Sequence, residues 1–513
     1  MTPMMDPNET QDANEKLSDI LEQNLFNIKR EIGNSFDIKT RTFQKRLSDG
    51  SMLHAGVVYT EGISALQSKI SDLFSETETA GSLCLQPSEC MDAMKQSILT
   101  DANIIDIFSL GELFHYLLAG YCIVMLDGTH RALAVDTVDV KARPVEEPSV
   151  QSVVRGPREG FSEVLSWNTA MLRRKIKSRN LWMESRVVGR ETQTTIVVAY
   201  VKGIVNDDVL EKVRKRLDRI DIDAILESNY IEEFIQDKQL TSFPTVFNSE
   251  RPDVVAAQLL EGKVAILVDG TPFALVVPAL FVQFFQSPED YYQRADFATL
   301  IRILRFISFH LTMLTPSIYI ALTTFQQELL PTTLIFNLAS QREGVPFPAF
   351  LEALIMEVTF EILREASVRM PKTVGQSISI VGTLVIGQAA VDAGLVTAGM
   401  VIVVSITAIS NFVMPAFNMG IAARILRFGL MALGATFGLF GVFLGIILIT
   451  VRLCNLKSFG VPYMSPMAPI HFKDQKDSLF RVPLPWMQLR PGSMKTKNRV
   501  RQKHYADGPE SES

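Results

Sequence analysis

The sequence FGLMALGATFGLFGVFLGIILITV, residues 428–451, holds 24 residues without a formal charge between Arg427 and Arg452. A helix rises about 1.5 Å per residue, so about 20 apolar residues cross the 30 Å hydrocarbon core of a bilayer. The stretch is therefore long enough to span a membrane as one helix. We predict a transmembrane helix here.

Other uncharged runs lie upstream of this one. Residues 306–327 carry no formal charge over 22 positions, and residues 373–423 hold 51 residues with a single charge, Asp392. The longer run divides into candidate spans at 376–395 and 396–414. Four apolar runs so close together leave too little polar surface to cover them in water. We expect residues 296–452 to form an all-α multipass membrane domain.

The composition of the whole chain excludes several classes of function. The 513 residues include 50 Lys and Arg against 56 Asp and Glu, with a net charge of -6. A nucleic-acid binder needs a basic face to neutralise phosphates, so that class is set aside. The four Cys and six His lack metal-ligand spacing, and no phosphate-binding loop or nucleophile motif occurs. We therefore expect no enzyme activity, no cofactor and no metal site.

Residues 1–295 are charged throughout and contain an internal repeat. The segment 118–135 recurs as 260–277 at an offset of 142 residues. Each copy places an Asp-Gly pair between two apolar runs, at Asp127 and at Asp269, which is typical of a tight hairpin turn. We predict an α/β soluble N-terminal half made of two related subdomains. The expected divisions are a flexible N-terminus at 1–35, a first α/β subdomain with a linker helix at 36–180, and a second α/β subdomain at 181–295.

Residues 349–370 have the period of a helix that carries one acidic stripe. Glu357, Glu361 and Glu365 follow one another at intervals of four residues, and like charges at this spacing repel. One interpretation is an amphipathic helix at the membrane surface with its acids in water. The other is a pore or ion pathway that attracts cations, with Asp392 as a further member. The residues alone leave both interpretations open.

The last predicted span carries a pattern of small residues. Gly434, Gly438, Gly441 and Gly445 fall on one narrow face of a continuous helix. Such faces let helix backbones approach closely in lipid, where packing replaces the hydrophobic driving force. We interpret this face as a helix-packing seam.

The positive-inside rule gives conflicting answers about the number of spans. Arg294, Arg302 and Arg305 precede the first span and favour a cytoplasmic N-terminal half. A basic cluster near the C-terminus favours a cytoplasmic basic tail at residues 453–513. Four spans keep both ends inside, but they leave the basic residues after the acidic helix on the far side. A five-span model removes that conflict, but it places the basic C-terminal tail outside the cytoplasm. Both counts therefore stay open.

Several longer motifs are similar to those of a known family. They read GPREGFSE at 156–163 with Asn168, LRRKI at 172–176, ERPD at 250–253, VPFP at 345–348, EILREA at 361–366 and GQAAV at 387–391. Together they resemble the A subunits of GerA-type spore germination receptors over about residues 36–470. The basic residues Arg158, Arg173 and Arg174 lie in these motifs. A solvated helix face would explain them, whereas the resemblance favours an interface between the repeats or with another subunit.

The resemblance implies a multipass protein of the spore inner membrane with a cytoplasmic N-terminal half. It implies that the chain senses small nutrients together with a multipass B-type subunit and a lipoprotein C-type subunit. The nutrient can then bind through a partner subunit. The expected outcome is germination through cation release, with a homo-oligomer of A subunits acting as a ligand-gated ion channel. A secondary transporter is the alternative, although transporters usually repeat their apolar halves and here the repeat lies in the soluble half.

Overall fold

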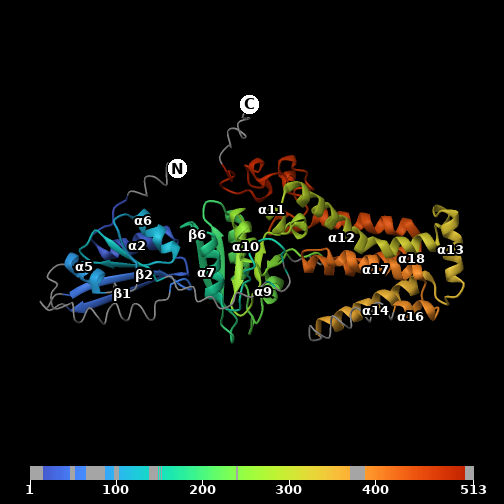
Figure 1. Cartoon of the computed structure of the whole chain (residues 1–513), viewed down its shortest axis with the longest axis horizontal. Coiled ribbons are helices and arrows are strands. Elements are labelled where there is room, and N and C mark those ends of the chain that lie inside the picture. Colours follow the sequence, from blue (N-terminus) through green and yellow to red (C-terminus); the bar gives the residue numbers. More distant parts are fainter. Residues whose placement is uncertain are drawn as a thin grey trace, which may run out of the picture. The chain divides into compact units, whose positions relative to one another are not determined.

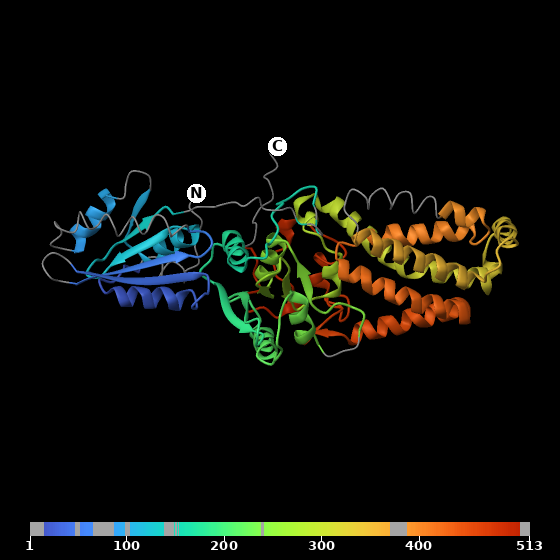
Figure 2. The ribbon, with the colours of Figure 1, turned by 90° about the horizontal axis from the view of Figure 1, so that it is seen from below.

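The computed structural model describes residues 15–46, 52–64, 87–97, 103–137, 148, 151, 153–237, 241–369 and 387–502. The chain divides into two compact units. The α/β unit comprises Met1–Gln236, Val246–Pro278 and Gln488–Ser513, and the helical unit comprises Asp237–Thr245 and Ala279–Met487. Figure 1 and Figure 2 show the ribbon from two directions.

The α/β unit is built on two five-stranded antiparallel sheets. The first contains β1 (Ile38–Arg46), β2 (Met52–Thr60), β3 (Ile104–Ile107), β4 (Cys122–Leu126) and β5 (Ala132–Val135) in the order β1-β2-β4-β5-β3. The second contains β6 (Leu181–Val188), β7 (Thr194–Val201), β8 (Phe247–Ser249), β9 (Val264–Val268) and β10 (Ala274–Val277) in the order β6-β7-β9-β10-β8. Corresponding strands hold the same positions in both sheets. The prediction of two related α/β subdomains is therefore confirmed.

In the first subdomain, helices cover both faces of the sheet (Figure 1). These helices are α2 (Leu21–Glu31), α5 (Pro87–Ser97) and α6 (Leu110–Ala119). Ile28 of α2 and Leu117 of α6 pack on the face that carries Val58, and Met91 of α5 packs on the face that carries Val57. Because neighbouring residues of a strand point to opposite faces, a strand covered on both sides is apolar along most of its length. The second subdomain contains α7 (Leu165–Lys175), α8 (Asp207–Leu217), α9 (Ser228–Ile235) and α10 (Pro252–Leu260).

The two repeated Asp-Gly turns do more than reverse the chain. Asp127 Oδ1 accepts a hydrogen bond from the backbone N–H of Leu21, the first residue of α2, at 2.9 Å. Asp269 Oδ1 accepts the equivalent bond from Leu165, the first residue of α7, at 3.1 Å. A carboxylate at a helix N-terminus satisfies an otherwise unpaired N–H and interacts favourably with the helix dipole. Each turn therefore caps the helix that opens its own subdomain.

This equivalence changes the expected subdomain boundaries. α7, expected as a linker helix of the first subdomain, opens the second one. Residues 15–35, expected within a flexible N-terminus, include α2 and open the first, whereas residues 1–14 lie outside the described part of the chain. The sequence did not show this because each capping carboxylate lies more than 100 positions from its helix.

The helical unit is made mainly of long helices. They are α12 (Ala295–Thr324), α13 (Thr332–Arg342), α14 (Ala349–Arg369), α17 (Ala398–Phe412) and α18 (Phe417–Asn455), with the shorter α11 (Glu289–Tyr292) and α16 (Gly387–Asp392). Large apolar side chains point outward, such as Ile307 of α12, Ile409 of α17 and Phe440 of α18, whereas Thr312 and Thr407 are fully buried. Lipid would cover such an apolar exterior, which water would not tolerate over so large an area.

The predicted spans coincide with the helices of this unit to different degrees. Spans 306–327 and 428–451 fall on α12 and α18, and these two helices are long and apolar enough to cross a membrane. Span 396–414 falls on α17, which is apolar but has only 15 residues. Span 376–395 begins outside the described residues and ends after α16.

α18 is not one straight helix, because the chain reverses at Gly438. Gly438 has φ 63° and ψ -146°, a left-handed conformation that glycine adopts readily. A Cβ on Gly445 would meet Leu430, which lies 15 positions earlier, so the two arms pack against each other. Figure 2 shows these arms, 417–437 and 439–455, side by side. The predicted single span over 428–451 is therefore the tip of a helical hairpin.

The side chain of Gln326 stabilises the reversal. Its Oε1 accepts a hydrogen bond from the backbone N–H of Leu439, the first residue of the second arm, at 3.1 Å. That N–H has no helical partner because the helix begins again there. Both arms have about the length of a membrane span, at 21 and 17 residues. The first arm begins and the second arm ends on the same side of the unit.

The segment after α18 returns to the start of α12. Arg302 Nε donates to Asp290 Oδ2 at 2.7 Å, and Arg302 Nη1 donates to Asp477 Oδ1 at 2.9 Å. Arg305 Nη1 donates to Asp290 Oδ1 at 2.8 Å. The basic residues before the first span and the segment that holds Asp477 therefore lie at one end of the helical unit. This placement does not require the C-terminal segment to be exported.

The last described residues belong to the α/β unit rather than to a free tail. Arg501 pairs with Glu261 at 2.6 Å, and Arg490 Nε donates to the carbonyl of Leu260 at 2.7 Å. The side chain of Asn206 donates to the carbonyl of Met494 at 3.0 Å. Part of the segment expected as a basic tail thus packs on the second subdomain.

We expect Asp269→Ala to destabilise the α/β unit by about 1 kcal/mol, since α7 loses its capping acceptor. For a unit of this size, such a loss lowers the midpoint of thermal unfolding by about 2 to 4 °C. Asp269→Asn is the matched control because its amide oxygen can still accept from Leu165. An equal loss in both variants would contradict the capping role.

We expect Gly438→Ala to reduce the amount of folded chain in the membrane fraction. A Cβ at this position would lie 2.6 Å from Gln326 Oε1, on a backbone with positive φ. Gly429→Ala is the control, because its Cβ meets nothing within 4 Å and alanine favours a helix. Quantitative immunoblotting should show loss of the first variant alone, and equal levels would argue against the reversal.

Candidate functional site

The acidic helix α14 lies at the edge of the helical unit (Figure 1) and packs against α12, α17 and α18. Its predicted stripe of carboxylates does not share one environment. Glu357 is fully buried, Glu361 is about one-quarter exposed, and Glu365 has 64% of its side chain exposed. The stripe therefore runs from the interior of the unit to its surface.

Arginines of α18 meet the two inner carboxylates. Glu357 lies 2.8 Å from Arg427 Nη2, and both side chains are buried. Glu361 lies 3.2 Å from the same nitrogen and 2.8 Å from Arg424. Arg364, one turn along α14, also donates to Glu361 at 3.2 Å. We call these five residues the carboxylate–arginine cluster.

The cluster holds two carboxylates against three guanidinium groups. Fully charged, it carries one net positive charge, so on its own it would not attract cations. Opposite charges relieve the repulsion that the i, i+4 spacing of Glu357 and Glu361 would otherwise produce. Breaking a buried pair leaves an uncompensated charge, which is strongly destabilising. The cluster therefore holds α14 against the first arm of α18.

A further buried carboxylate, Glu352, was not found from the sequence. Its Oε1 accepts hydrogen bonds from the backbone N–H and the hydroxyl of Thr397, each at 2.6 Å. Thr397 is the N-cap of α17, and its hydroxyl in turn accepts from Met400 N–H. Glu352 thus caps a second helix from 45 positions away, a distance at which no local sequence signal exists.

The outer acidic residues are paired with neighbours on their own helices. Glu365 forms an i, i+4 ion pair with Arg369 at 2.6 Å. Asp392 is exposed and accepts from the side chain of Gln388 at 3.0 Å. Both lie on the surface of this single chain. Their predicted role in an ion pathway stays a prediction.

The four glycines of the predicted seam are buried around the α18 reversal. A Cβ on Gly434 would lie 2.8 Å from the carbonyl oxygen of Ser317 in α12. A Cβ on Gly441 or Gly445 would instead overlap Leu433 of the first arm or approach it closely. The glycines therefore serve contacts between the two arms and with α12, rather than one face of a continuous helix.

The three predicted interface arginines of the α/β unit lie in different places. Arg173 is fully buried and donates to both carboxylate oxygens of Asp37, at 2.7 and 2.9 Å. It joins α7 of the second subdomain to the loop before β1 of the first. Arg174 is partly exposed and pairs with Glu159 at 2.9 Å, and Arg158 is exposed. Of these three arginines, only Arg158 and Arg174 are at least partly exposed, and their role at a subunit interface stays a prediction.

Metal chemistry has no support in the described part of the chain. There, no group of three or more His, Cys, Asp or Glu side chains could hold a metal ion. The clustered charges are instead the carboxylates and arginines described above. Their position inside an apolar helical unit is typical of functional residues in membrane proteins.

Comparison with known proteins identifies the family of this chain. The profile of the family described as Bacillus/Clostridium GerA spore germination protein matches residues 26–493. The chain belongs to this GerA family. The resemblance noted from the sequence motifs is therefore confirmed.

Individual relatives of this GerA-family chain cover most of its length. Spore germination protein KA of Bacillus subtilis (strain 168) is 47% identical over 95% of this chain and 89% of its own. Spore germination protein GerLA of Bacillus cereus is 40% identical over 75% of this chain and 79% of its own. The crystal structure of the N-terminal domain of the A subunit of the Bacillus megaterium spore germinant receptor GerK3 is 40% identical. The match covers 53% of this chain and 99% of that domain, with a TM-score of 0.43.

We expect Glu357→Gln to lower the stability of the purified full-length chain in detergent by about 3 kcal/mol, because Arg427 loses its closest partner. Thermal unfolding measures the change. Glu365→Gln is the control, since an exposed pair contributes less than about 1 kcal/mol. The double variant Glu357→Gln, Arg427→Gln should lose less than the sum of the two single variants. Additive losses would contradict a direct interaction.

Proposed function

We propose that this chain is the A subunit of a germinant receptor in the spore inner membrane. It senses small nutrients together with a multipass B-type subunit and a lipoprotein C-type subunit. Its response triggers germination by cation release. Membership of the GerA family and the names of its relatives support the receptor role.

The observation that carries the membrane part of this proposal is the apolar exterior of the helical unit, together with the charges buried inside it. Large apolar side chains are exposed along its helices, and a few charged and hydroxyl groups, such as Glu357 and Arg427, are buried among apolar residues in its interior. Charged groups at this depth in a membrane protein mark ion or substrate pathways. The α/β unit is then cytoplasmic, in line with the arginines that precede the first span.

The ion pathway forms when several A subunits assemble. In a single chain, Glu365 and Asp392 are exposed, and assembly would place each of them near its counterpart on a neighbouring copy. A ring of carboxylates attracts cations at a pore entrance. Glu357 and Glu361 lie deeper, where the arginines of α18 neutralise them. A change that separates α14 from α18 would expose these two carboxylates to the same pathway.

Exposed basic residues supply a surface for assembly of the α/β units. Arg158 and Arg174 lie outside the core, unlike Arg173, and can meet acidic side chains of a neighbouring subunit. Contacts of this kind set orientation and association rate more than affinity. They would align the subunits without fixing the nutrient that is recognised.

A secondary transporter would also place charges inside its helical bundle, and electrical recording separates the two functions. The reconstituted receptor complex should show a gated conductance without a fixed ratio of nutrient to ion flux. Coupled flux at a fixed ratio would favour the transporter.

We expect Glu365→Gln to slow nutrient-triggered K⁺ release from spores several-fold, because one carboxylate is lost from each subunit of the ring. Release is followed with a K⁺-selective electrode at matched protein level. Glu343→Gln, at an exposed position after α13, is the control and should release K⁺ normally. Normal release from both variants would remove Glu365 from the ion pathway.

A further inference from the structure

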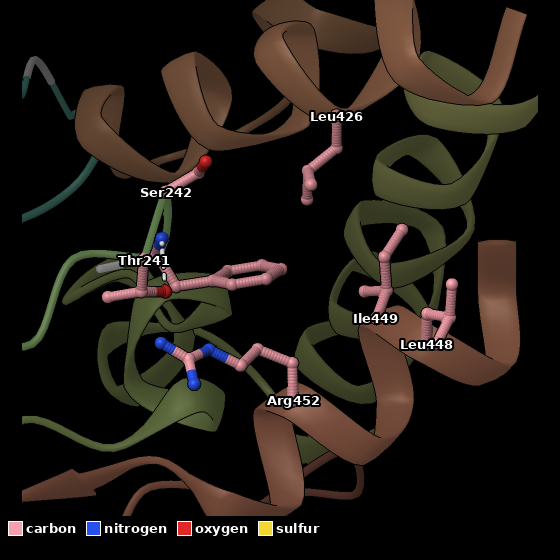
Figure 3. Close-up of a pocket in the computed structure, with 7 residues that line it drawn as sticks. Thr241, Ser242, Leu426, Leu448, Ile449 and Arg452 are labelled. Carbon is pink, nitrogen blue, oxygen red and sulfur yellow. Dashed lines mark hydrogen bonds between the residues drawn. The ribbon is translucent and has the colours of Figure 1, made fainter. Parts of the chain in front are cut away.

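A pocket of about 430 Å³ lies beside the α18 hairpin within the helical unit (Figure 3). Leu426 of the first arm and Leu448 and Ile449 of the second arm form one part of its wall. The rest of the wall comes from residues 241–243 and from Arg452. Segment 237–245 belongs to the helical unit, although the chain on both sides of it belongs to the α/β unit.

The apolar part of the pocket faces the exterior of the unit. Leu448 has 59% of its surface exposed, and its neighbours Ile447 and Val451 are exposed as well. Phe243, which also lines the pocket, is buried. An apolar wall that opens toward an apolar exterior is accessible from the hydrocarbon of a bilayer rather than from water.

The polar part lies at the end of the second arm. Arg452 is the first charged residue after the uncharged run of α18, in the last turn of the helix. Figure 3 shows its side chain reaching toward Thr241, while Leu426 lies on the opposite side of the pocket. Thr241 and Ser242 add hydroxyl groups that can donate hydrogen bonds. Figure 3 shows the hydroxyl of Ser242 turned away from Arg452, so Arg452 and Thr241 supply the cation and the hydroxyl group that suit a phosphate.

We infer that this pocket binds an anionic phospholipid. One acyl chain lies along Leu426, Leu448 and Ile449, and the headgroup phosphate meets Arg452 and the hydroxyl group of Thr241. Arginine at the end of a membrane helix lies at headgroup depth, where anionic lipids concentrate. The volume is within the range of small-ligand sites, so it holds part of one lipid while the remainder stays in the bilayer.

A water-soluble anion fits these observations less well, because it would leave the apolar wall empty. A bound lipid would link segment 237–245 to both arms of the hairpin. The inference rests on the membrane location in the proposed function, but not on ion conduction.

The test uses the full-length chain purified in detergent and titrated with dioleoylphosphatidylglycerol. Thermal unfolding reports binding as a rise of the midpoint with lipid concentration. The same rise of the midpoint should need a clearly higher concentration of dioleoylphosphatidylcholine than of dioleoylphosphatidylglycerol. Inorganic phosphate at the concentration used for phosphatidylglycerol should give no rise. Arg452→Gln should weaken the response to phosphatidylglycerol about fivefold, the usual effect of one basic residue near an anionic membrane surface.

Arg294→Gln is the matched control, because Arg294 has 87% of its side chain exposed and lies outside the pocket. It should leave the lipid response unchanged. Ile449→Trp keeps every charge but fills the pocket, and should weaken the response as Arg452→Gln does. This second variant separates loss of the site from a general loss of positive charge.

Equal responses to the two lipids, a full response to inorganic phosphate, or equal losses in Arg294→Gln and Arg452→Gln would each overturn the lipid site. These outcomes leave the receptor role standing, since K⁺ release measures that role separately. A chain that does not stay in the membrane fraction would instead contradict the proposed function itself.

Discussion

The ion pair between Glu357 and Arg427 places two charges inside an otherwise apolar helical unit. Moving each charge out of water costs several kcal/mol, and only a close partner of opposite sign offsets that cost. The pair therefore fixes which face of α14 meets α18, because a rotation of α14 would bury an unpartnered carboxylate. Glu361, one turn further along, then contacts the same arginine, and Glu365 is left at the surface. A single buried pair thus divides the acidic stripe into an inner and an outer part.

The hairpin of α18 supplies the other half of this arrangement. Its reversal needs a glycine at Gly438, a side-chain acceptor from Gln326 and close approach to α12 at Gly434. Because the two arms are antiparallel, Arg427 in the first arm and Arg452 in the second both lie well away from the tip. The same fold explains why the segment after α18 meets Arg302 at the beginning of α12. The close packing of glycines at the reversal and the ion pairs away from it are both satisfied by the same path of the chain, a hairpin.

Sequence patterns located the repeat, the apolar runs and the acidic helix because each is a local or periodic property of the chain. The same patterns could not identify interaction partners that lie far apart in the sequence. Glu352 caps a helix that begins 45 positions later, and Asp127 caps one that begins 106 positions earlier. The reversal at Gly438 was also missed, since a glycine-rich apolar run has the same composition in a straight helix and in a hairpin. Arg173 looked like one member of a basic surface group, whereas its carboxylate partner lies 136 positions away.

The chain crosses between the α/β unit and the helical unit four times. The backbone passes between the units at 236/237, 245/246, 278/279 and 487/488. Both ends of segment 237–245 bond to the helical unit: Asp237 accepts from the N–H of Phe459, and the carbonyl of Thr245 accepts from the hydroxyl of Ser458. Both partners follow directly after α18. A displacement of this short segment would therefore act on the end of the second arm. The first arm would follow through the packing at Gly445, and Arg427 lies on that arm.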